Sequence, residues 1–166
     1  MDRFSTARLH AARLAAEDLD DLVALHLDTE VSRFLGGVRT PEVTAAYLDT
    51  NLRHWRDRGV GLWVLRADDG AFVGRAGLRY VDLEGVEELE IAYTLAKPAW
   101  GQGLATEIAK ALVGVWRTRR SDPSLVGLVM KGHHASEHVL LKTGFTYQRD
   151  AVFHAAAVGV FRLNRG

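Results

Sequence analysis

Residues 93–106 read YTLAKPAWGQGLAT and join a strand-like segment to a helical one. Glycine adopts positive φ angles without a steric penalty, so Gly101 and Gly103 permit a tight turn and a close approach of the backbone to a ligand. The first turn of the following helix presents N–H groups without intrahelical partners and the positive end of the helix dipole. The segment predicts a phosphate or pyrophosphate site, although a tight strand-to-helix turn needs glycine for backbone reasons alone.

The sequence on either side of this segment changes from strand-like to helical periodicity. Residues 88–95 alternate in the manner of a strand. After the two glycines, apolar residues recur at helical spacing, at Leu104, Ile108, Leu112, Val115 and Trp116. A long helix is therefore expected to begin at the glycines, directly after the strand.

The rest of the chain holds further strand-like and helical segments, with glycines and prolines between them. Strands are expected at residues 8–13, 61–67, 71–80 and 125–131 and twice after residue 145, and helices at about 17–29, 41–59 and 135–143. Thr40 is expected to cap the second of these helices, and Asp69-Gly70 to form a tight hairpin turn. The order β-α-α-β-β-β-α-β-α-β-β predicts a single α/β domain over residues 1–166, built around a mixed sheet.

Composition and charge exclude several classes of function. Lysine plus arginine and aspartate plus glutamate both total 21, so the formal charge is zero and no nucleic-acid partner is expected. The chain has no cysteine, which excludes disulfides, thiolate nucleophiles and thiolate metal ligands and favours a cytoplasmic location. No run of about 18 apolar residues occurs, so no membrane partner is expected.

Several short motifs accompany the glycine-rich segment. It lacks Gly-Lys-Ser/Thr, and Thr106 stands at the third glycine position of a dinucleotide-binding fingerprint, so neither of these phosphate loops is present. Instead, WGQGLATE at residues 100–107 is similar to the R/Q-x-x-G-x-G/A coenzyme A motif of the GNAT acetyltransferases, with Trp100 at the usual Arg or Gln. It also resembles W-G-x-G-[YL]-A-T-E of their RimJ/RimL-type branch. Further similarities to that branch are TARL at residues 6–9, EDL at 17–19, EIAY at 90–93 and residues 135–145.

The resemblance implies the GNAT fold, a mixed central sheet flanked by helices, and the transfer of an acetyl group from acetyl-coenzyme A to a primary amine without a metal. The acceptor would be a peptide amino terminus or a small molecule, and a homodimer is an open alternative to a monomer. One departure is His133, which stands where the family usually has Asn. The residues that the resemblance assigns to acetyl-coenzyme A are Tyr93, Leu95, Trp100, Gly101, Gln102, Gly103, Leu104, Ala105, Thr106, His133 and Ser136.

The strand before the loop carries the predicted base. Alternation places Glu88 and Glu90 on one face and Leu89, Ile91 and Tyr93 on the other. In the family this strand borders the thioester and the acceptor cleft, so Glu90 is the preferred general base. The alternatives are Glu88, water alone, or a solvated strand face without a catalytic role.

Other candidate residues lie in the helices and strands around this region. The resemblance assigns the protonation of the departing thiolate to Ser136, whereas serine near a helix start is more often a cap. Phe34, Trp55 and Trp63 are candidates for lining the acceptor pocket, although a place in the core is the preferred interpretation for each.

Two other functions are compatible with parts of the sequence. HASEH at residues 134–138 matches the H-x-x-E-H motif of some zinc peptidases, with His134 and His138 as ligands and Glu137 as base. The expected helix is short, and no downstream carboxylate other than Asp150 is evident as a third ligand. Both points weigh against a zinc site. A non-catalytic acyl-coenzyme A sensor would keep the glycine-rich loop but lack turnover, and the departure at His133 makes it a second alternative.

Overall fold

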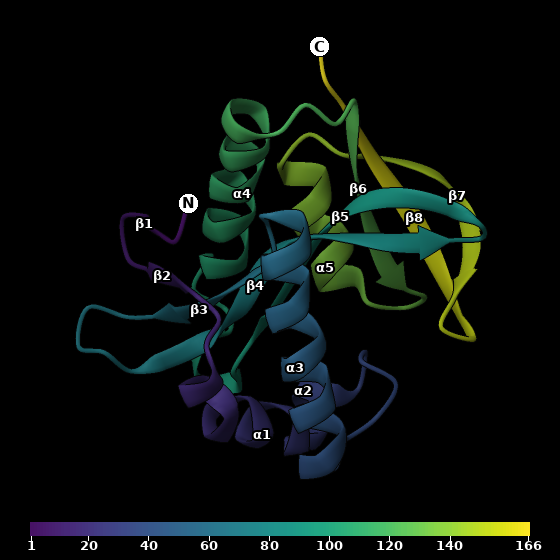
Figure 1. The fold of residues 1–166 in the computed structure, drawn as a ribbon. Coiled ribbons are helices and arrows are strands. Elements are labelled where there is room, and N and C mark those ends of the chain that lie inside the picture. The colour runs from purple at the N-terminus through teal and green to yellow at the C-terminus, as the bar shows by residue number, and fades with distance from the viewer. The chain divides into compact units, whose positions relative to one another are not determined.

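The computed structural model describes residues 1–166 and divides into two compact units, whose elements are labelled in Figure 1. Unit 1 comprises Met1–Gly77 and Tyr93–Ala105, and unit 2 comprises Leu78–Ala92 and Thr106–Gly166. Three elements contribute residues to both units: the strands β4 (Phe72–Leu83) and β5 (Val86–Leu95) and the helix α4 (Leu104–Arg119).

Unit 1 contains an antiparallel succession of strands and three helices. The strands β1 (Arg3–Ser5), β2 (His10–Arg13), β3 (Leu62–Arg66) and the first half of β4 pair in this order. The helices are α1 (Leu19–Leu27), α2 (Thr29–Ser32) and α3 (Pro41–Arg58), with short 3-10 turns η1 (Ala16–Asp18) and η2 (Lys97–Ala99).

The predicted first strand, residues 8–13, is wrong in its start. A turn occupies residues 6–9, where the Thr6 amide donates to the Leu9 carbonyl at 2.9 Å, and β2 begins only at His10. The sequence prediction also missed β1 and α2, which are three and four residues long. Elements this short do not complete a period of two or 3.6 residues often enough to be recognised.

Helix α3 begins and ends as predicted. The Thr40 hydroxyl accepts a hydrogen bond from the Val43 amide at 3.2 Å, and Gly59 ends the helix in the left-handed region at φ 66°. The side-chain cap satisfies one of the amides that the first helical turn leaves without an intrahelical partner.

Replacing Thr40 by alanine removes this acceptor, and we expect Thr40→Ala to lower the free energy of unfolding by about 1 kcal/mol. Urea denaturation measures the change, and Thr40→Ser, which keeps the hydroxyl, is the matched control. Equal stability of the alanine and serine variants would show that the cap contributes nothing.

The core of unit 1 is built around two tryptophans. Trp55 of α3 and Trp63 of β3 are both buried and meet edge to face, with ring centroids 4.9 Å apart. The Trp55 indole N–H donates to the Leu62 carbonyl at 2.7 Å, and Phe4 packs edge to face on Trp63. These contacts identify Trp55 and Trp63 as core residues, which is the interpretation that the sequence favours for both.

Unit 2 contains the rest of β4 and β5, most of α4, and the elements β6 (Ser124–Met130), α5 (His134–Lys142), β7 (Thr146–Phe153) and β8 (Ala156–Asn164). Strands β5 and β6 are parallel, with Glu90 opposite Val126, whereas β6 with β8 and β8 with β7 are antiparallel. A buried cluster fills its core: Leu83, Val126, Ala151, Val158 and Val160.

The strands form an eight-stranded sheet in the order β1-β2-β3-β4-β5-β6-β8-β7. The predicted α/β class with a mixed sheet is therefore confirmed.

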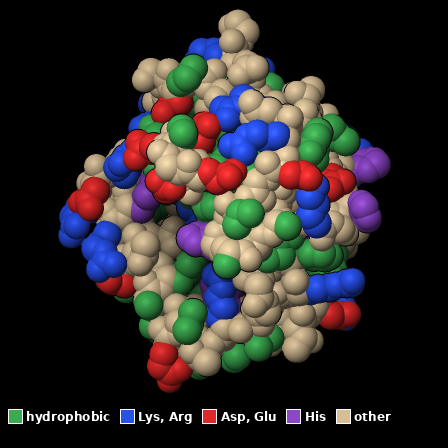
Figure 2. All heavy atoms as spheres, turned by 90° about the vertical axis from the view of Figure 1, so that its right-hand side faces the viewer, with side chains coloured by type: hydrophobic (Ala, Val, Ile, Leu, Met, Phe, Trp, Pro, Cys, Tyr) green, Lys and Arg blue, Asp and Glu red, His purple; other side chains and the backbone are tan.

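On the face drawn in Figure 2, acidic and basic side chains are interspersed rather than separated into large patches of one sign. None of the helices combines the length and the apolar composition that a membrane span requires.

Candidate functional site

The glycine-rich loop of unit 1 has the conformation that its sequence predicts. Gly101 and Gly103 have φ angles of 73° and 76°, in the left-handed region that costs other residues about 1–2 kcal/mol. The Trp100 indole N–H donates to the Leu95 backbone carbonyl, and the side-chain amide of Gln102 donates to the Pro98 backbone carbonyl, both at 2.9 Å. The strand end and the turn thus fix the loop, and α4 begins directly after it at Leu104.

Arg8 contacts this loop from the turn between β1 and β2. Its Nη1 donates to the Gln102 carbonyl at 2.8 Å, and its Nη2 lies 3.7 Å from the position that a Cβ atom on Gly103 would occupy. A guanidinium is always charged at neutral pH and suits phosphate oxygens. The loop therefore combines left-handed glycines, a helix start and a permanent positive charge, which is the chemistry of an anion site.

We expect Arg8→Gln to weaken the binding of coenzyme A about tenfold, since it removes one charge that favours phosphate at a partly exposed site. Calorimetric titration measures the dissociation constant. S-acetylpantetheine, which lacks the pyrophosphate, is the matched ligand control and should lose little affinity. Equal losses for both ligands would mean that Arg8 acts on the fold of the loop and not on phosphate.

Glu90, the predicted base, lies in the part of β5 that belongs to unit 2. Only 5% of it is exposed, and the Arg79 Nε donates to its Oε2 at 2.9 Å. The alternative prediction, a solvated strand face, is therefore wrong for this residue. The guanidinium fixes the orientation of the carboxylate through one oxygen, Oε2, and a proton transfer would use the other oxygen, Oε1.

Glu88, the alternative base, has a different arrangement in unit 2. Arg162 of β8 binds both of its oxygens, with Nη2 to Oε1 at 2.6 Å and Nη1 to Oε2 at 3.1 Å. The Arg162 Nη1 also donates to the Ser124 hydroxyl at 2.6 Å. Because both oxygens accept from one guanidinium fork, Glu88 is less suited than Glu90 to accept a proton from a ligand.

His133 and Ser136 lie at the start of α5 in unit 2. His133 occupies the N-cap position without a side-chain cap, and Ser136 is the third helical residue. The alternative interpretation of Ser136, a helix N-cap, is therefore wrong. Burial lowers the pKa of His133, so its imidazole is neutral at pH 7 and offers one donor and one acceptor nitrogen. Such an imidazole can replace one hydrogen bond of the amide that the family usually has here.

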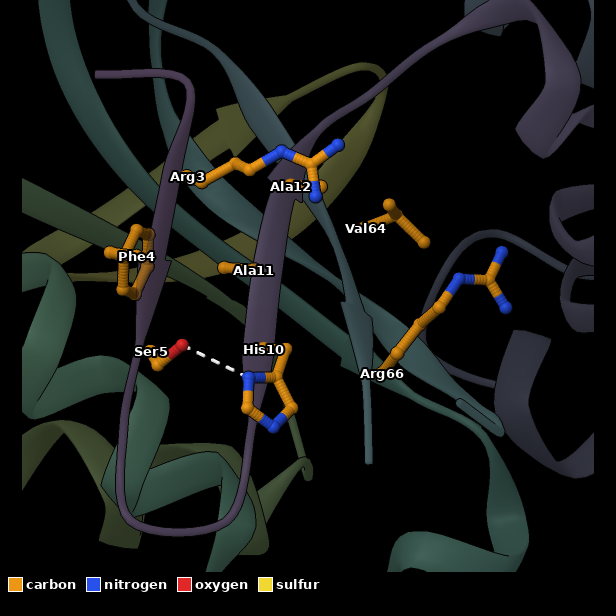
Figure 3. A pocket seen from close by; sticks show the side chains of 8 residues that line it. All are labelled: Arg3, Phe4, Ser5, His10, Ala11, Ala12, Val64 and Arg66. Atoms are coloured by element: carbon orange, nitrogen blue, oxygen red, sulfur yellow. Dashed lines mark hydrogen bonds between the residues drawn. The ribbon is translucent and has the colours of Figure 1, made fainter. Parts of the chain in front are cut away.

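A groove on the surface of unit 1 holds the Ser5 hydroxyl next to the His10 imidazole (Figure 3), and His10 also contacts the Asp68 carboxylate. The Ser5 hydroxyl is 3.0 Å from His10 Nδ1, and His10 Nε2 is 2.6 Å from Asp68 Oδ1. The same types of group form the triad of serine hydrolases. However, the His10 and Asp68 side chains are 54% and 81% exposed. Water therefore competes for the hydrogen bonds of both side chains, and their contact contributes little to stability. The residues that line the groove are Arg3, Phe4, Ser5, His10, Ala11, Ala12, Val64 and Arg66.

Comparison with known proteins decides the family. Residues 8–146 match the acetyltransferase (GNAT) domain. The chain belongs to the GNAT acetyltransferase family. It is 30% identical over 139 residues to the uncharacterized protein YkkB of Bacillus subtilis (strain 168), which covers 80% of each chain.

Solved structures share the fold of this GNAT acetyltransferase. An acetyltransferase from Agrobacterium tumefaciens str. C58 is similar with a TM-score of 0.86 and 23% identity, over 99% of this chain and 95% of the other. The aminoglycoside acetyltransferase AAC(6')-Ib, in complex with coenzyme A, is similar with a TM-score of 0.79 and 16% identity, over 95% of each chain.

The zinc motif gains no support in this GNAT acetyltransferase. His134 Nδ1 lies 3.5 Å from Glu137 Oε2, and the His134 side chain is 85% exposed. The structure brings together no group of three or more potential metal-ligating side chains. The pair is a solvent-exposed contact between residues three apart in a helix, and exposed contacts of this kind contribute little to stability.

The sequence prediction for this GNAT acetyltransferase missed Arg8 and Arg79 as partners of the site. The sequence holds a partial signal for Arg79 in Gly85, a typical turn residue, and in the structure Glu84 and Gly85 form a two-residue turn with φ angles of 50° and 87° between β4 and β5. Positive φ at both positions is typical of tight hairpins, and counting outward from this turn pairs Arg79 with Glu90. No comparable local signal exists for Arg8, which is 94 residues from Gln102 in the sequence.

Proposed function

We propose that this GNAT acetyltransferase transfers the acetyl group of acetyl-coenzyme A directly to a primary amine on a peptide amino terminus or a small molecule. The observation that carries the proposal is the loop at residues 100–106, with Gly101 and Gly103 in the left-handed region and Arg8 against Gln102. The WGQGLATE motif also supports a place in the RimJ/RimL-type branch. The continuous family match over residues 8–146 supports a single catalytic domain.

In this proposal the loop holds the pyrophosphate of acetyl-coenzyme A. The backbone N–H groups after Gly103 face the phosphate oxygens, and Arg8 adds a charge-assisted contact. The flexible arm and the thioester then contact the remaining residues that the family resemblance assigns to the ligand: Tyr93, Leu95, Trp100, His133 and Ser136. Similarity to an acetyltransferase solved with coenzyme A supports this assignment.

The chemical step forms a C–N bond to the amine and breaks the C–S bond of the thioester. Glu90 accepts the proton that the amine loses, and Ser136 donates a proton to the departing thiolate. For an α-amine of pKa about 7.8, deprotonation at pH 7 costs about 1 kcal/mol, against roughly 4.6 kcal/mol for a lysine-like amine near 10.4. A base therefore matters most for the more basic acceptors. Holding the two reactants together supplies on the order of 7–11 kcal/mol.

A thiol-release assay tests this function. The protein is incubated with acetyl-coenzyme A and a panel of α-amines, polyamines and aminoglycosides, and free thiol is measured with a chromogenic disulfide. We expect release above the amine-free rate for at least one class of acceptor. Binding of coenzyme A without release for any amine would support the sensor and overturn the proposed transfer.

A further inference from the structure

An exposed tryptophan stands at the start of the glycine-rich loop of unit 1. Of the four tryptophans in the chain, Trp55, Trp63 and Trp116 are at most 3% exposed, whereas Trp100 is 45% exposed. A large aromatic ring at the surface forgoes the stabilisation that burial would give it. Single exposed apolar side chains are common, so exposure alone identifies no ligand.

Hydrogen bonds fix the position of this ring. The Trp100 indole N–H donates to the Leu95 backbone carbonyl at the end of β5 at 2.9 Å, and the Trp100 backbone amide donates to the Lys97 carbonyl at 3.0 Å. The indole nitrogen is the only polar atom of the side chain, and it is engaged. The ring is thus held in one orientation and presents apolar carbon atoms to solvent.

The loop after this ring has the space and the charge that an anionic ligand requires. Residues 100–103 are all exposed, and Gly101 and Gly103 bring no side chain. A Cβ atom placed on Gly101 would meet no other atom within 4 Å. Arg8 binds the Gln102 carbonyl from the turn between β1 and β2. An exposed aromatic ring beside an anion site suits a nucleotide, whose base stacks on the ring while its phosphates bind the loop.

We propose that Trp100 stacks on the adenine of acetyl-coenzyme A. The proposal rests on the function proposed above, in which the loop holds the pyrophosphate. A single ribose joins the adenine to that pyrophosphate, so the base lies close to the residues that flank the loop. Trp100 directly precedes Gly101, at the exposed end of this stretch.

The flat shape of adenine distinguishes it from the other half of the ligand. Aromatic rings in offset stacks gain more than the burial of their surface alone supplies. The flexible arm is a chain of single bonds and amides without an aromatic face. We therefore assign Trp100 to the adenine instead of to the arm, where the family resemblance alone places it. Because the ring is already oriented, stacking costs little side-chain entropy.

Tryptophan fluorescence tests this contact in the parent protein. The other three tryptophans are buried, so acrylamide should quench the emission of Trp100 selectively. We expect saturating coenzyme A to reduce this quenching at least twofold, and ADP, which has the base and the pyrophosphate without the arm, to do the same. Phosphopantetheine, which has the arm without the base, should leave the quenching unchanged. Equal protection by phosphopantetheine, or none by coenzyme A, would overturn the proposal.

Trp100→Phe and Trp100→Leu form a matched pair of variants. Both lose the indole N–H that binds the Leu95 carbonyl, so the difference between them isolates the aromatic face. In calorimetric titrations the leucine variant should bind coenzyme A about tenfold more weakly than the phenylalanine variant, the scale of base–aromatic stacking. Both variants should bind phosphopantetheine equally. Equal affinities for coenzyme A would contradict stacking, and an equal difference for both ligands would place the ring on the arm.

The binding of coenzyme A separates this proposal from the function on which it rests. No binding to the parent protein would overturn both. Binding that leaves Trp100 fully accessible to acrylamide would overturn the stacking alone. Protection of Trp100 by coenzyme A and ADP, together with no acetyl transfer to any amine, would support the stacking and overturn the proposed transfer.

Discussion

A Gly103→Asp variant loses the binding of coenzyme A. In the parent protein, a hundredfold excess of ligand over its dissociation constant stabilises the native state by about 2.7 kcal/mol, which appears as a thermal shift. In the variant, the aspartate must adopt the left-handed φ angle of 76°, and its Cβ lies within 3.7 Å of Arg8 Nη2. The new carboxylate pairs with Arg8 and repels the pyrophosphate, at a cost of about 4 kcal/mol for unit charges roughly 4 Å apart.

Gly103→Asn separates charge from backbone strain. Asparagine has the shape of aspartate and tolerates the left-handed region better than most residues, but it brings no charge. We therefore expect the asparagine variant to keep a reduced thermal shift and the aspartate variant to keep none. A full shift in Gly103→Asp at millimolar coenzyme A would show that the phosphates bind elsewhere.

Glu90→Gln should lower kcat/KM by about a hundredfold at neutral pH, the usual scale of general-base catalysis. Glutamine keeps the size of the side chain and an acceptor oxygen for Arg79 while it removes the basicity. The loss should shrink as the pH rises, because an acceptor that is already deprotonated needs no base, and it should be smaller for α-amines than for lysine-like amines. Steady-state rates over a range of pH measure both effects.

Glu88→Gln is the matched control on the same strand. Like Glu90→Gln, it removes a carboxylate that is paired with an arginine, in this case Arg162. We expect it to change kcat/KM by only a few fold. Melting temperatures of both variants show whether a lost ion pair has disturbed the fold. An unchanged rate and pH profile in Glu90→Gln would leave catalysis to proximity and water.

Most of the fold follows from local sequence patterns. Helix α3 has a threonine cap, proline in its first turn, an apolar face and a terminal glycine, and the structure contains each of these features. The hairpin between β3 and β4 is confirmed, but its turn is centred on Asp68-Asp69, because the Gly70 amide donates to the Ala67 carbonyl at 2.9 Å. The missed elements, β1 and α2, are too short to show a period, and tertiary packing decides their structure.

The candidate site was predicted only where its residues lie in one segment. Residues 100–106 are consecutive, so their glycines and the following helix predict an anion site. The partners of this segment and of β5 are arginines from distant parts of the chain: Arg8 binds Gln102, and Arg162 binds Glu88 from 74 residues away. Such pairs depend on sheet register and long-range packing, which periodicity does not report.

Mass spectrometry after incubation with acetyl-coenzyme A labelled in the acetyl carbon tests direct transfer to an amine most directly. With acetyl-coenzyme A alone, the mass of the protein should stay unchanged and no thiol should appear. After an accepted amine is added, one free thiol should form for each labelled amide, and Gly103→Asp should show neither. Thiol release without acetylated amine, or a covalently acetylated protein that precedes the product, would contradict the account.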